Sequence, residues 1–343
     1  MEVKKAKREK IKVPIMITGA SGSGKTVSAL IMAKGIIEKM FPDLPEHEQW
    51  EKIGVIDTEH KRSLLYANTL IGKTEIGEFM HVDFEAPFTV DRYVEAFNLL
   101  KGHGVEVILV DSMTHAWSAE GGILEQVEKF QRGNPKMQMQ AWNKVKPTEK
   151  AFLRLLTGNS VYVIGTTRSK QAYDMSKDEN GKTQIVKMGL KPDQKDSLEY
   201  EFAIAFRIDE HHFAEATKDN SNLFSAGFQI TKETGHQIYE WSSEGIDLEK
   251  VRDELISEIT QLAGSSDQHE KLFAELHGKI QNQPLKNIKT KWLESMKARL
   301  EKIEVKQVEE KQLETQQELF DSRKPPMDTV AEELPEMLEK DSE

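Results

Sequence analysis

The chain of 343 residues is long enough for one large domain or two ordinary ones. It contains no cysteine, which excludes disulfides and thiolate metal sites and is compatible with a reducing cytoplasm. Its net charge of −11 lies mostly beyond Trp241, and its charged N-terminus and lack of a long apolar run predict a cytoplasmic protein with neither a signal peptide nor a membrane span.

The first segment in chain order, residues 1–12, is basic, with six Lys and Arg residues against two Glu residues. Such a segment can contact a phosphate backbone, or it can be a solvated leader. The composition does not decide between these interpretations, and both stay open.

The next element is the octapeptide GASGSGKT at residues 19–26, which follows the apolar run Val13–Thr18 and precedes a helical pattern. It fits the Walker A spacing Gly-x-x-x-x-Gly-Lys-Ser/Thr of a phosphate-binding loop (P-loop). The glycines allow close approach of the backbone, and the loop N–H groups form an anion nest at a helix N-terminus. We expect Lys25 to reach the β- and γ-phosphates of ATP and Thr26 to bind Mg²⁺. The expected nucleotide contacts in this loop are Gly19, Ala20, Ser21, Gly22, Ser23, Gly24, Lys25, Thr26 and Val27.

Apolar runs further along the chain alternate with helical segments such as FTVDRYVEAFNLLKGHG, which is typical of a mostly parallel α/β sheet. The expected strands are Lys52–Glu59, Phe79–Glu85, Val105–Ser112, Ser160–Thr167 and Tyr200–Asp209. After Asp209 the pattern changes to short strands, HHFAEATKDN and GFQITKE, and we expect these to extend the sheet in antiparallel fashion.

Two of the expected strands end in carboxylates. Asp111 ends one of them and is the expected carboxylate on the Mg²⁺ side. Asp57 and Glu59 end the strand nearest in sequence to the P-loop helix. Because strand C-termini line the ligand crevice of an open parallel sheet, Glu59 can face the γ-phosphate and orient the attacking water. Asp57 can instead structure the turn.

The pattern becomes helical from Asp247, which is a suitable N-cap residue. Two amphipathic stripes follow, and such stripes are usually packing faces. The first is Leu248, Val251, Leu255, Ile259 and Leu262, and the second is Leu285, Ile288, Trp292, Met296, Leu300 and Ile303. From about Val305 the chain is rich in Glu and Gln, and we expect disorder there. The predicted organisation is a basic arm (1–12), an ATPase domain (13–243), a helical region (244–304) and an acidic disordered tail (305–343).

Several stretches together resemble a known family. IGVIDTEHKRSLLYANTL resembles the strand–Glu–helix segment of RecA-like recombinases, and VILVDS resembles their Walker B strand. The closer resemblance is to phage-encoded RecA-like ATPases of the AAA superfamily, a group associated with single-strand annealing and recombination beside phage single-strand-binding proteins. QAWNKVKP, VIGTTRSKQAY, KMGLKPDQKDSLEYEF and ITKETGHQIYEW match the same group, so the resemblance covers about residues 13–243. It implies a RecA-like P-loop ATPase that forms homo-oligomers on single-stranded DNA.

The resemblance also implies residue roles at the nucleotide. Lys25 and Thr26 would hold phosphate and Mg²⁺, Asp111 would hold Mg²⁺ through water, and Glu59 would be the catalytic carboxylate. Two further catalytic candidates come from the end of the strand Ser160–Thr167. Either Thr166 or Thr167 can sense the γ-phosphate there, and Arg168 follows in the loop.

Basic residues of one subunit reach the nucleotide of the next in RecA-like filaments. Lys187, Lys191 and Lys218 are the candidates for this role in the present chain, with exposed surface charge as the alternative for each. The family pattern often continues Lys-Asp-Arg, whereas this chain has Asn220 after Lys218 and Asp219, which weakens the case for Lys218.

The loop Arg168–Lys195 is a candidate contact for single-stranded DNA. It is rich in basic side chains, Tyr173 is its only aromatic residue, and Gly181 predicts a turn, so the loop can be a mobile hairpin that orders on a strand. A solvated lid over ATP explains the loop as well, and a P-loop kinase would need such a lid. For the protein as a whole, a third interpretation beside the DNA-dependent ATPase and the kinase is a nucleotide-gated adaptor of a phage replication complex, with slow ATPase activity.

The tail contains a short motif, Gln316-Gln317-Glu318-Leu319-Phe320. Its spacing resembles the peptide by which bacterial DNA-metabolism proteins dock on the replicative sliding clamp. Leu319 and Phe320 can fill an apolar pocket while Gln316 hydrogen-bonds its rim. Chance occurrence in a Gln/Glu/Leu-rich segment, or a last apolar helical turn, explains the motif as well.

Overall fold

The computed structural model describes residues 3, 5–158, 160–177, 183–195, 197–303 and 315, with the backbone alone for residues 171–190. The chain divides into two compact units, Met1–Ile246 and Asp247–Glu343. Gly181 and the motif Gln316–Phe320 lie outside the described residues, as does nearly all of the predicted tail.

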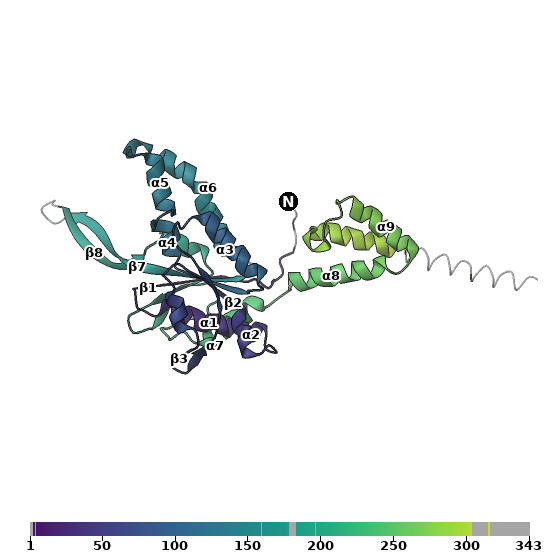
Figure 1. The fold of residues 1–343 in the computed structure, drawn as a ribbon, viewed down its shortest axis with the longest axis horizontal. Helices are drawn as coiled ribbons and strands as arrows, with labels where there is room; N and C mark the ends of the chain where they lie inside the picture. Colours follow the sequence, from purple (N-terminus) through teal and green to yellow (C-terminus); the bar gives the residue numbers. More distant parts are fainter. Residues whose placement is uncertain are drawn as a thin grey trace, which may run out of the picture. The chain divides into compact units, whose positions relative to one another are not determined.

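The first unit is built on a twisted sheet that has helices on both faces (Figure 1). Among the described residues the strand order is β10–β9–β1–β7–β6–β2–β5, and β8 pairs with β7 off this path. The strands are β1 (Pro14–Gly19), β2 (Ile53–Asp57), β5 (Met80–Asp83), β6 (Val107–Asp111), β7 (Tyr162–Lys177), β8 (Thr183–Pro192), β9 (Ile204–Ile208) and β10 (Ala214–Asp219). Every pair along the main path is parallel except β9–β10. The predicted α/β fold, a mostly parallel sheet with an antiparallel extension, is confirmed.

Helices cover both faces of this sheet because its buried strands alternate apolar side chains between two cores. In β6, Ile108 and Val110 belong to one core, and Val107 and Leu109 belong to the other. The first core is covered by α3 (Val90–Gly102), α4 (Met113–Ser118), α5 (Ile123–Gln131) and α6 (Gln138–Thr157). The second is covered by α1 (Lys25–Met40), α2 (Glu46–Glu51) and α7 (Lys232–Ser243). Shorter elements are the 3₁₀ helices η1 (Arg62–Tyr66), η2 (Pro135–Met137) and η3 (Leu198–Glu201), and a hairpin of β3 (Thr69–Ile71) and β4 (Thr74–Ile76).

Three expected strands differ clearly from the structure in length. The segment Tyr200–Asp209 is a strand only over β9, because its first residues belong to η3. The segment GFQITKE makes only an isolated bridge between Phe228 and Ala214, because a capping box at Thr231 and Thr234 starts α7 immediately afterwards. The strand expected to end at Thr167 instead continues to Lys177 as β7 and turns back as β8, so the loop after Arg168 is a long antiparallel hairpin (Figure 1).

The helix that begins at the P-loop, α1, contacts α7 through backbone. A Cβ atom added to Gly35 would lie 2.0 Å from the carbonyl oxygen of Lys232, and one added to Gly235 would lie 2.1 Å from that of Met32. Both positions therefore need glycine for the helices to pack at this distance, and the packing anchors the P-loop helix.

The basic arm is partly held by the first unit. The guanidinium of Arg8 forms an ion pair with Glu244 at 2.5 Å and donates to the carbonyl of Trp241, and Lys12 Nζ lies 2.8 Å from Glu106. These two cations are therefore engaged within the protein.

The second unit is helical. It comprises α8 (Leu248–Ala263), α9 (Asp267–Gly278), η4 (Leu285–Asn287) and a further helix at residues 290–303. Asp247 caps α8 by accepting from the Lys250 N–H at 3.1 Å, as predicted. The first predicted stripe is wrong at Leu248 and Val251, which are exposed, and only its later members are on a packed face. The second is wrong at Trp292, which is 52% exposed, whereas Leu293 is buried. The extended backbone at Ile288 separates η4 from the next helix. The second stripe is therefore not one continuous helix, and its residues do not all lie on one helical face as their spacing had indicated. Within the described residues, no helix has both the length and the apolarity needed to cross a membrane.

Candidate active site

The P-loop lies between β1 and α1. Gly22 and Gly24 have φ values of 84° and 87°, a left-handed conformation that glycine adopts without strain. The free N–H groups of the first turn of α1 face the loop, and no acidic residue occupies that turn. Lys25 Nζ donates to the carbonyl oxygens of Gly19 at 3.1 Å and Ala20 at 2.8 Å. The loop is therefore built as an anion nest, with Lys25 folded back along it.

Asp111 lies beside the P-loop at the end of β6. Its two carboxylate oxygens accept hydrogen bonds from the hydroxyls of Thr26 and Thr166, each at 2.5 Å. Burial raises the pKa of Asp111. Mg²⁺ prefers oxygen ligands and is commonly held by one or two carboxylates together with water and substrate phosphates, so the pair Thr26–Asp111 fits a Mg²⁺–nucleotide complex. In the described part of the chain no cluster of three or more His, Cys, Asp or Glu residues could hold a metal alone.

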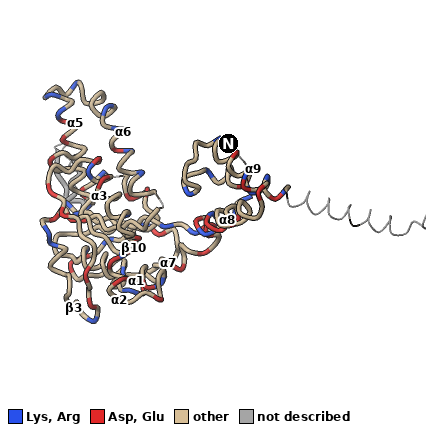
Figure 2. The backbone as a smooth tube through the Cα atoms, turned by 45° about the vertical axis from the view of Figure 1, so that its right-hand side comes forward, with Lys and Arg blue, Asp and Glu red and all other residues tan. Residues whose placement is uncertain are grey.

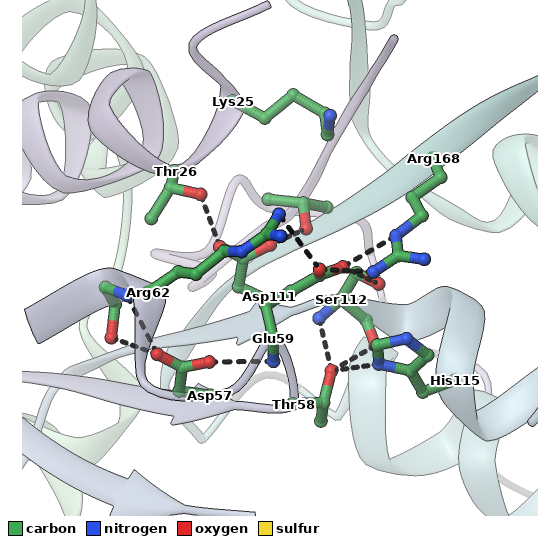
Figure 3. Close-up of polar contacts among 12 residues, drawn as sticks. Lys25, Thr26, Asp57, Thr58, Glu59, Arg62, Asp111, Ser112, His115 and Arg168 are labelled. Carbon is green, nitrogen blue, oxygen red and sulfur yellow. Dashed lines mark hydrogen bonds and ion pairs between the residues drawn. The ribbon is translucent and has the colours of Figure 1, made fainter. Parts of the chain in front are cut away.

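Glu59 follows β2 and forms an ion pair with Arg168 (Figure 3). Arg168 Nε donates to Oε1 at 2.8 Å and Nη2 donates to Oε2, so the contact is bidentate. The hydroxyl of Ser112 also donates to Oε1, at 3.2 Å. Burial raises the pKa of Glu59, but the hydrogen bonds and charge of Arg168 outweigh burial and hold this pKa below its ordinary value. Glu59 is therefore ionised, as a group that orients or deprotonates water must be.

Asp57, the neighbouring carboxylate, holds the turn together. It is buried and accepts hydrogen bonds from the Glu59 N–H at 2.8 Å, the Ser63 N–H at 2.9 Å and the Ser63 hydroxyl at 2.6 Å. Burial raises its pKa, but these bonds and the nearby His81 together lower the pKa of Asp57 to about 2. Asp57 thereby fixes the backbone that carries Glu59.

The two threonines at the end of the sheet portion of β7 point in opposite directions, as successive strand residues do. Thr166 contacts Asp111, and Thr167 Oγ1 lies 2.7 Å from Thr18 Oγ1 on β1. Of the two γ-phosphate candidates, Thr166 thus lies on the Mg²⁺ side, and Thr167 joins β7 to the strand beneath the P-loop.

One cavity of about 710 Å³ is lined by Lys25, Thr26, Glu59, Asp111 and Arg168, together with residues that the sequence patterns did not indicate. Arg62 on η1 points toward Glu59 from the side opposite Arg168, with Nη1 4.0 Å from Oε2 (Figure 3). His212, in the loop after β9, places Nδ1 2.9 Å from the carbonyl oxygen of Ser23. Both follow C-terminal ends of strands, so the strand-end rule that indicated Glu59 could have indicated them as well.

A mixed apolar and aromatic wall completes the cavity. It is formed by Tyr66, Ile71 and Ile230. Such surfaces suit the flat, largely apolar face of a nucleobase, and the charged side chains that line the same cavity suit its phosphates.

Two of the lysines that were candidates for action on a neighbouring subunit, Lys191 and Lys218, are not among the described residues that line this cavity. Lys191 is exposed on β8, opposite Lys170 of β7. Lys187 pairs with Tyr173 in the same hairpin, and only its backbone is described. Lys218 Nζ donates to the carbonyl of Tyr200 at 2.5 Å.

A family model of the AAA domain matches residues 11–237. The chain belongs to the AAA-domain family. The match spans the P-loop, Glu59, Asp111 and Arg168. In this AAA domain, β7 lies between β1, the strand before the P-loop, and β6, the strand that ends in Asp111. The AAA-type P-loop ATPase class predicted from the motifs is thus confirmed, and with it nucleotide binding, which such domains usually combine with Mg²⁺.

No curated protein significantly matches this chain. Among solved structures, the chain is similar to a KaiC-like protein from the hyperthermophilic archaeon Pyrococcus horikoshii OT3, with 15% sequence identity and a TM-score of 0.37. That similarity covers 65% of this chain and 88% of the archaeal one. The family match, and not this distant likeness, carries the assignment.

Proposed function

We propose that this AAA domain hydrolyses ATP with Mg²⁺ and uses the cycle to act on single-stranded DNA in phage recombination or annealing. The observation that carries the hydrolysis is the convergence of Lys25, Thr26, Asp111 and Glu59 on one cavity. Phosphoryl transfer needs little covalent chemistry from the protein, so positioned charges supply most of the catalysis. Bound Mg²⁺ would neutralise developing phosphate charge.

Each residue of the site then has a defined task. The P-loop N–H groups and Lys25 bind the phosphates, and Lys25 exchanges its carbonyl acceptors for phosphate oxygens. Thr26 and Asp111 would hold Mg²⁺, Asp111 through water. Glu59 orients the attacking water toward the γ-phosphate.

The ion pair with Arg168 bears on how fast this reaction runs. Arg168 occupies one lone-pair site on each carboxylate oxygen of Glu59, and Ser112 occupies a second site on Oε1, so the closed ion pair leaves little of the carboxylate to accept from the attacking water. Arg168 lies where β7 leaves the sheet for the hairpin, and its carbonyl accepts from the Asp193 N–H at 2.6 Å. This arrangement supports slow basal turnover that rises when a DNA strand engages the hairpin. It also suits the second candidate, a nucleotide-gated adaptor of a phage replication complex with slow turnover.

The ATPase rate, measured as phosphate release with and without single-stranded DNA at two salt concentrations, tests the proposal. We expect stimulation by DNA that weakens at higher salt, because phosphate contacts release counterions. Turnover that ignores DNA favours the adaptor. Phosphate that appears only on an acceptor molecule supports a P-loop kinase and contradicts the proposal.

The proposal extends to partners. We propose that the protein forms homo-oligomers, works beside the phage single-strand-binding protein in the host cytoplasm and contacts the sliding clamp through Gln316–Phe320. The family resemblance supports the first two, and the spacing of the tail motif supports the third.

A further inference from the structure

A second cavity, of about 690 Å³, lies outside the nucleotide site among residues of α4, α6 and the base of the β7–β8 hairpin. Trp117 and Trp142 line it side by side, with ring centroids 6.0 Å apart and planes 32° from parallel. Trp117 is 9% exposed and Trp142 is partly buried. Within the described residues, neither indole N–H has a hydrogen-bond partner. The partly exposed ring of Trp142, backed by the buried ring of Trp117, thus borders the cavity, and neither indole N–H is engaged by a described residue.

Lysines surround the tryptophans. Lys146, Lys170 and Lys195 all line the cavity. Lys170 pairs with Asp193 at 2.6 Å, and Lys195 pairs with Glu149. Lys146 is exposed and makes no ion pair with any described residue. Its charge is therefore available to a negative group that enters the cavity.

Lys146 also begins a basic row on α6. Trp142, Lys146, Lys150 and Arg154 follow at intervals of four residues, so they lie along one slowly winding side of the helix. The three basic side chains are exposed, and Figure 2 shows Lys and Arg residues along α5 and α6. In a chain with a net charge of −11, such a row indicates a negative occupant.

The geometry points to a base-stacking site for a single nucleic-acid strand, with one base against Trp142 and Trp117 and the following phosphates along Lys146, Lys150 and Arg154. Aromatic side chains next to a positive track are how proteins hold single strands without reading sequence, because every base has a π-face. The free indole N–H groups can donate to base carbonyls or phosphate oxygens. The inference rests on the proposed function, since it assigns the place at which the DNA strand is held.

The cavity is close enough to the nucleotide site for occupancy to affect hydrolysis. Trp117 lies on α4, and the amide of Gln194, which also lines the cavity, donates to the Met113 carbonyl of that helix at 3.0 Å. The Thr114 hydroxyl of α4 accepts from the N–H of Arg168 at 3.0 Å. A base against Trp117 therefore contacts the helix that positions the partner of the catalytic carboxylate.

The test uses the full chain and a fluorescently labelled oligothymidine, with binding followed by anisotropy over a range of salt concentrations. Trp142→Leu removes the stacking ring and is expected to weaken binding by about 5- to 150-fold. Lys146→Gln is expected to weaken binding and to lower the slope of log affinity against log salt by about one. Trp292→Leu and Lys291→Gln, at exposed positions of the second unit, are the matched controls and are expected to bind like wild type.

Thermal melting and ATP binding report whether each variant is folded. Trp142→Phe keeps an aromatic ring and is expected to retain most of the affinity. If Trp142→Leu unfolds, the double variant Lys146→Gln/Lys150→Gln carries the test, because both side chains are exposed.

If the wild-type protein binds the strand and the folded variants bind it equally well, this inference is overturned while the proposed function stands. Wild-type protein that binds no oligonucleotide at low salt contradicts both. Loss of self-association in Trp142→Leu with unchanged DNA affinity would make the cavity an interface between copies, which also overturns the inference.

Discussion

Replacing Glu59 by Gln removes the charge that orients water while it preserves the shape of the side chain. A positioned general base usually contributes about 10²- to 10⁴-fold to a rate. We therefore expect kcat to fall by about this factor, which corresponds to about 3–5 kcal/mol in the barrier. The P-loop and the Thr26–Asp111 pair are untouched, so the affinity for ATP should stay within a few-fold of wild type.

The stability of the fold should change much less than the barrier. The Glu59 side chain is 11% exposed and that of Arg168 is 44% exposed, so the guanidinium that loses its partner stays in contact with water. Solvent screening reduces the value of such a pair, and we expect the free energy of unfolding to fall by about 1 kcal/mol. The loss of activity therefore cannot be explained by unfolding.

Single-turnover phosphate release and equilibrium binding of a fluorescent ATP analogue, measured on the same preparation, separate chemistry from binding. Glu95→Gln, an exposed carboxylate on α3, is the matched control and should behave as wild type. Near-wild-type hydrolysis by Glu59→Gln would refute the reasoning, because another group would then have to position the water.

Four further predictions follow from the site and the sequence. Lys25→Ala should weaken ATP binding as well as hydrolysis, and an unchanged affinity in a titration with a fluorescent analogue would contradict this. The pKa of Asp57 falls from 3.8 to about 2 in the fold, so its ionised carboxylate stabilises the protein above pH 4, and this effect is lost as the pH falls to 2. Asp57→Asn should therefore lower the free energy of unfolding in urea by about 2 kcal/mol at pH 7, and by less in acid. If Lys191 acts on a neighbouring nucleotide, mixing Lys191→Ala with Glu59→Gln should recover activity, and no recovery in co-assembled mixtures counts against it. A peptide spanning residues 314–322 should bind the host sliding clamp with micromolar Kd by calorimetry, and no binding at a few hundred micromolar would reject the motif.

The sequence predicted the parts of the site that depend on local chemistry. The P-loop has fixed spacing because its glycines, Lys25 and Thr26 must all reach one phosphate chain, and that constraint is visible in eight residues. Asp111 and Glu59 were predicted because each follows a buried strand whose C-terminal end opens on the crevice.

Their places after strand ends make Arg62 and His212 candidates for the crevice, but what each side chain contacts there depends on tertiary arrangement, which leaves little local signal. Arg62 reaches Glu59 because Lys61, in a left-handed conformation with φ of 61°, turns the chain into η1. His212 reaches the P-loop only because β9 pairs with β1, and that pairing joins segments almost two hundred residues apart. The register of the second unit failed at Trp292 for a similar reason, since the two non-helical residues 288 and 289 change which side chains face inward.

The glycine contact between α1 and α7 has a consequence for how this sequence can diverge over evolutionary time. Core positions usually drift in compensating pairs, because one side chain can shrink when its neighbour grows. At Gly35 and Gly235 the space is filled by the opposite backbone, at Lys232 and Met32, and no change of side chain can move a carbonyl oxygen. These two positions therefore have no compensating partner, and we expect related chains that keep this helix pairing to retain glycine at both while the surrounding apolar residues vary.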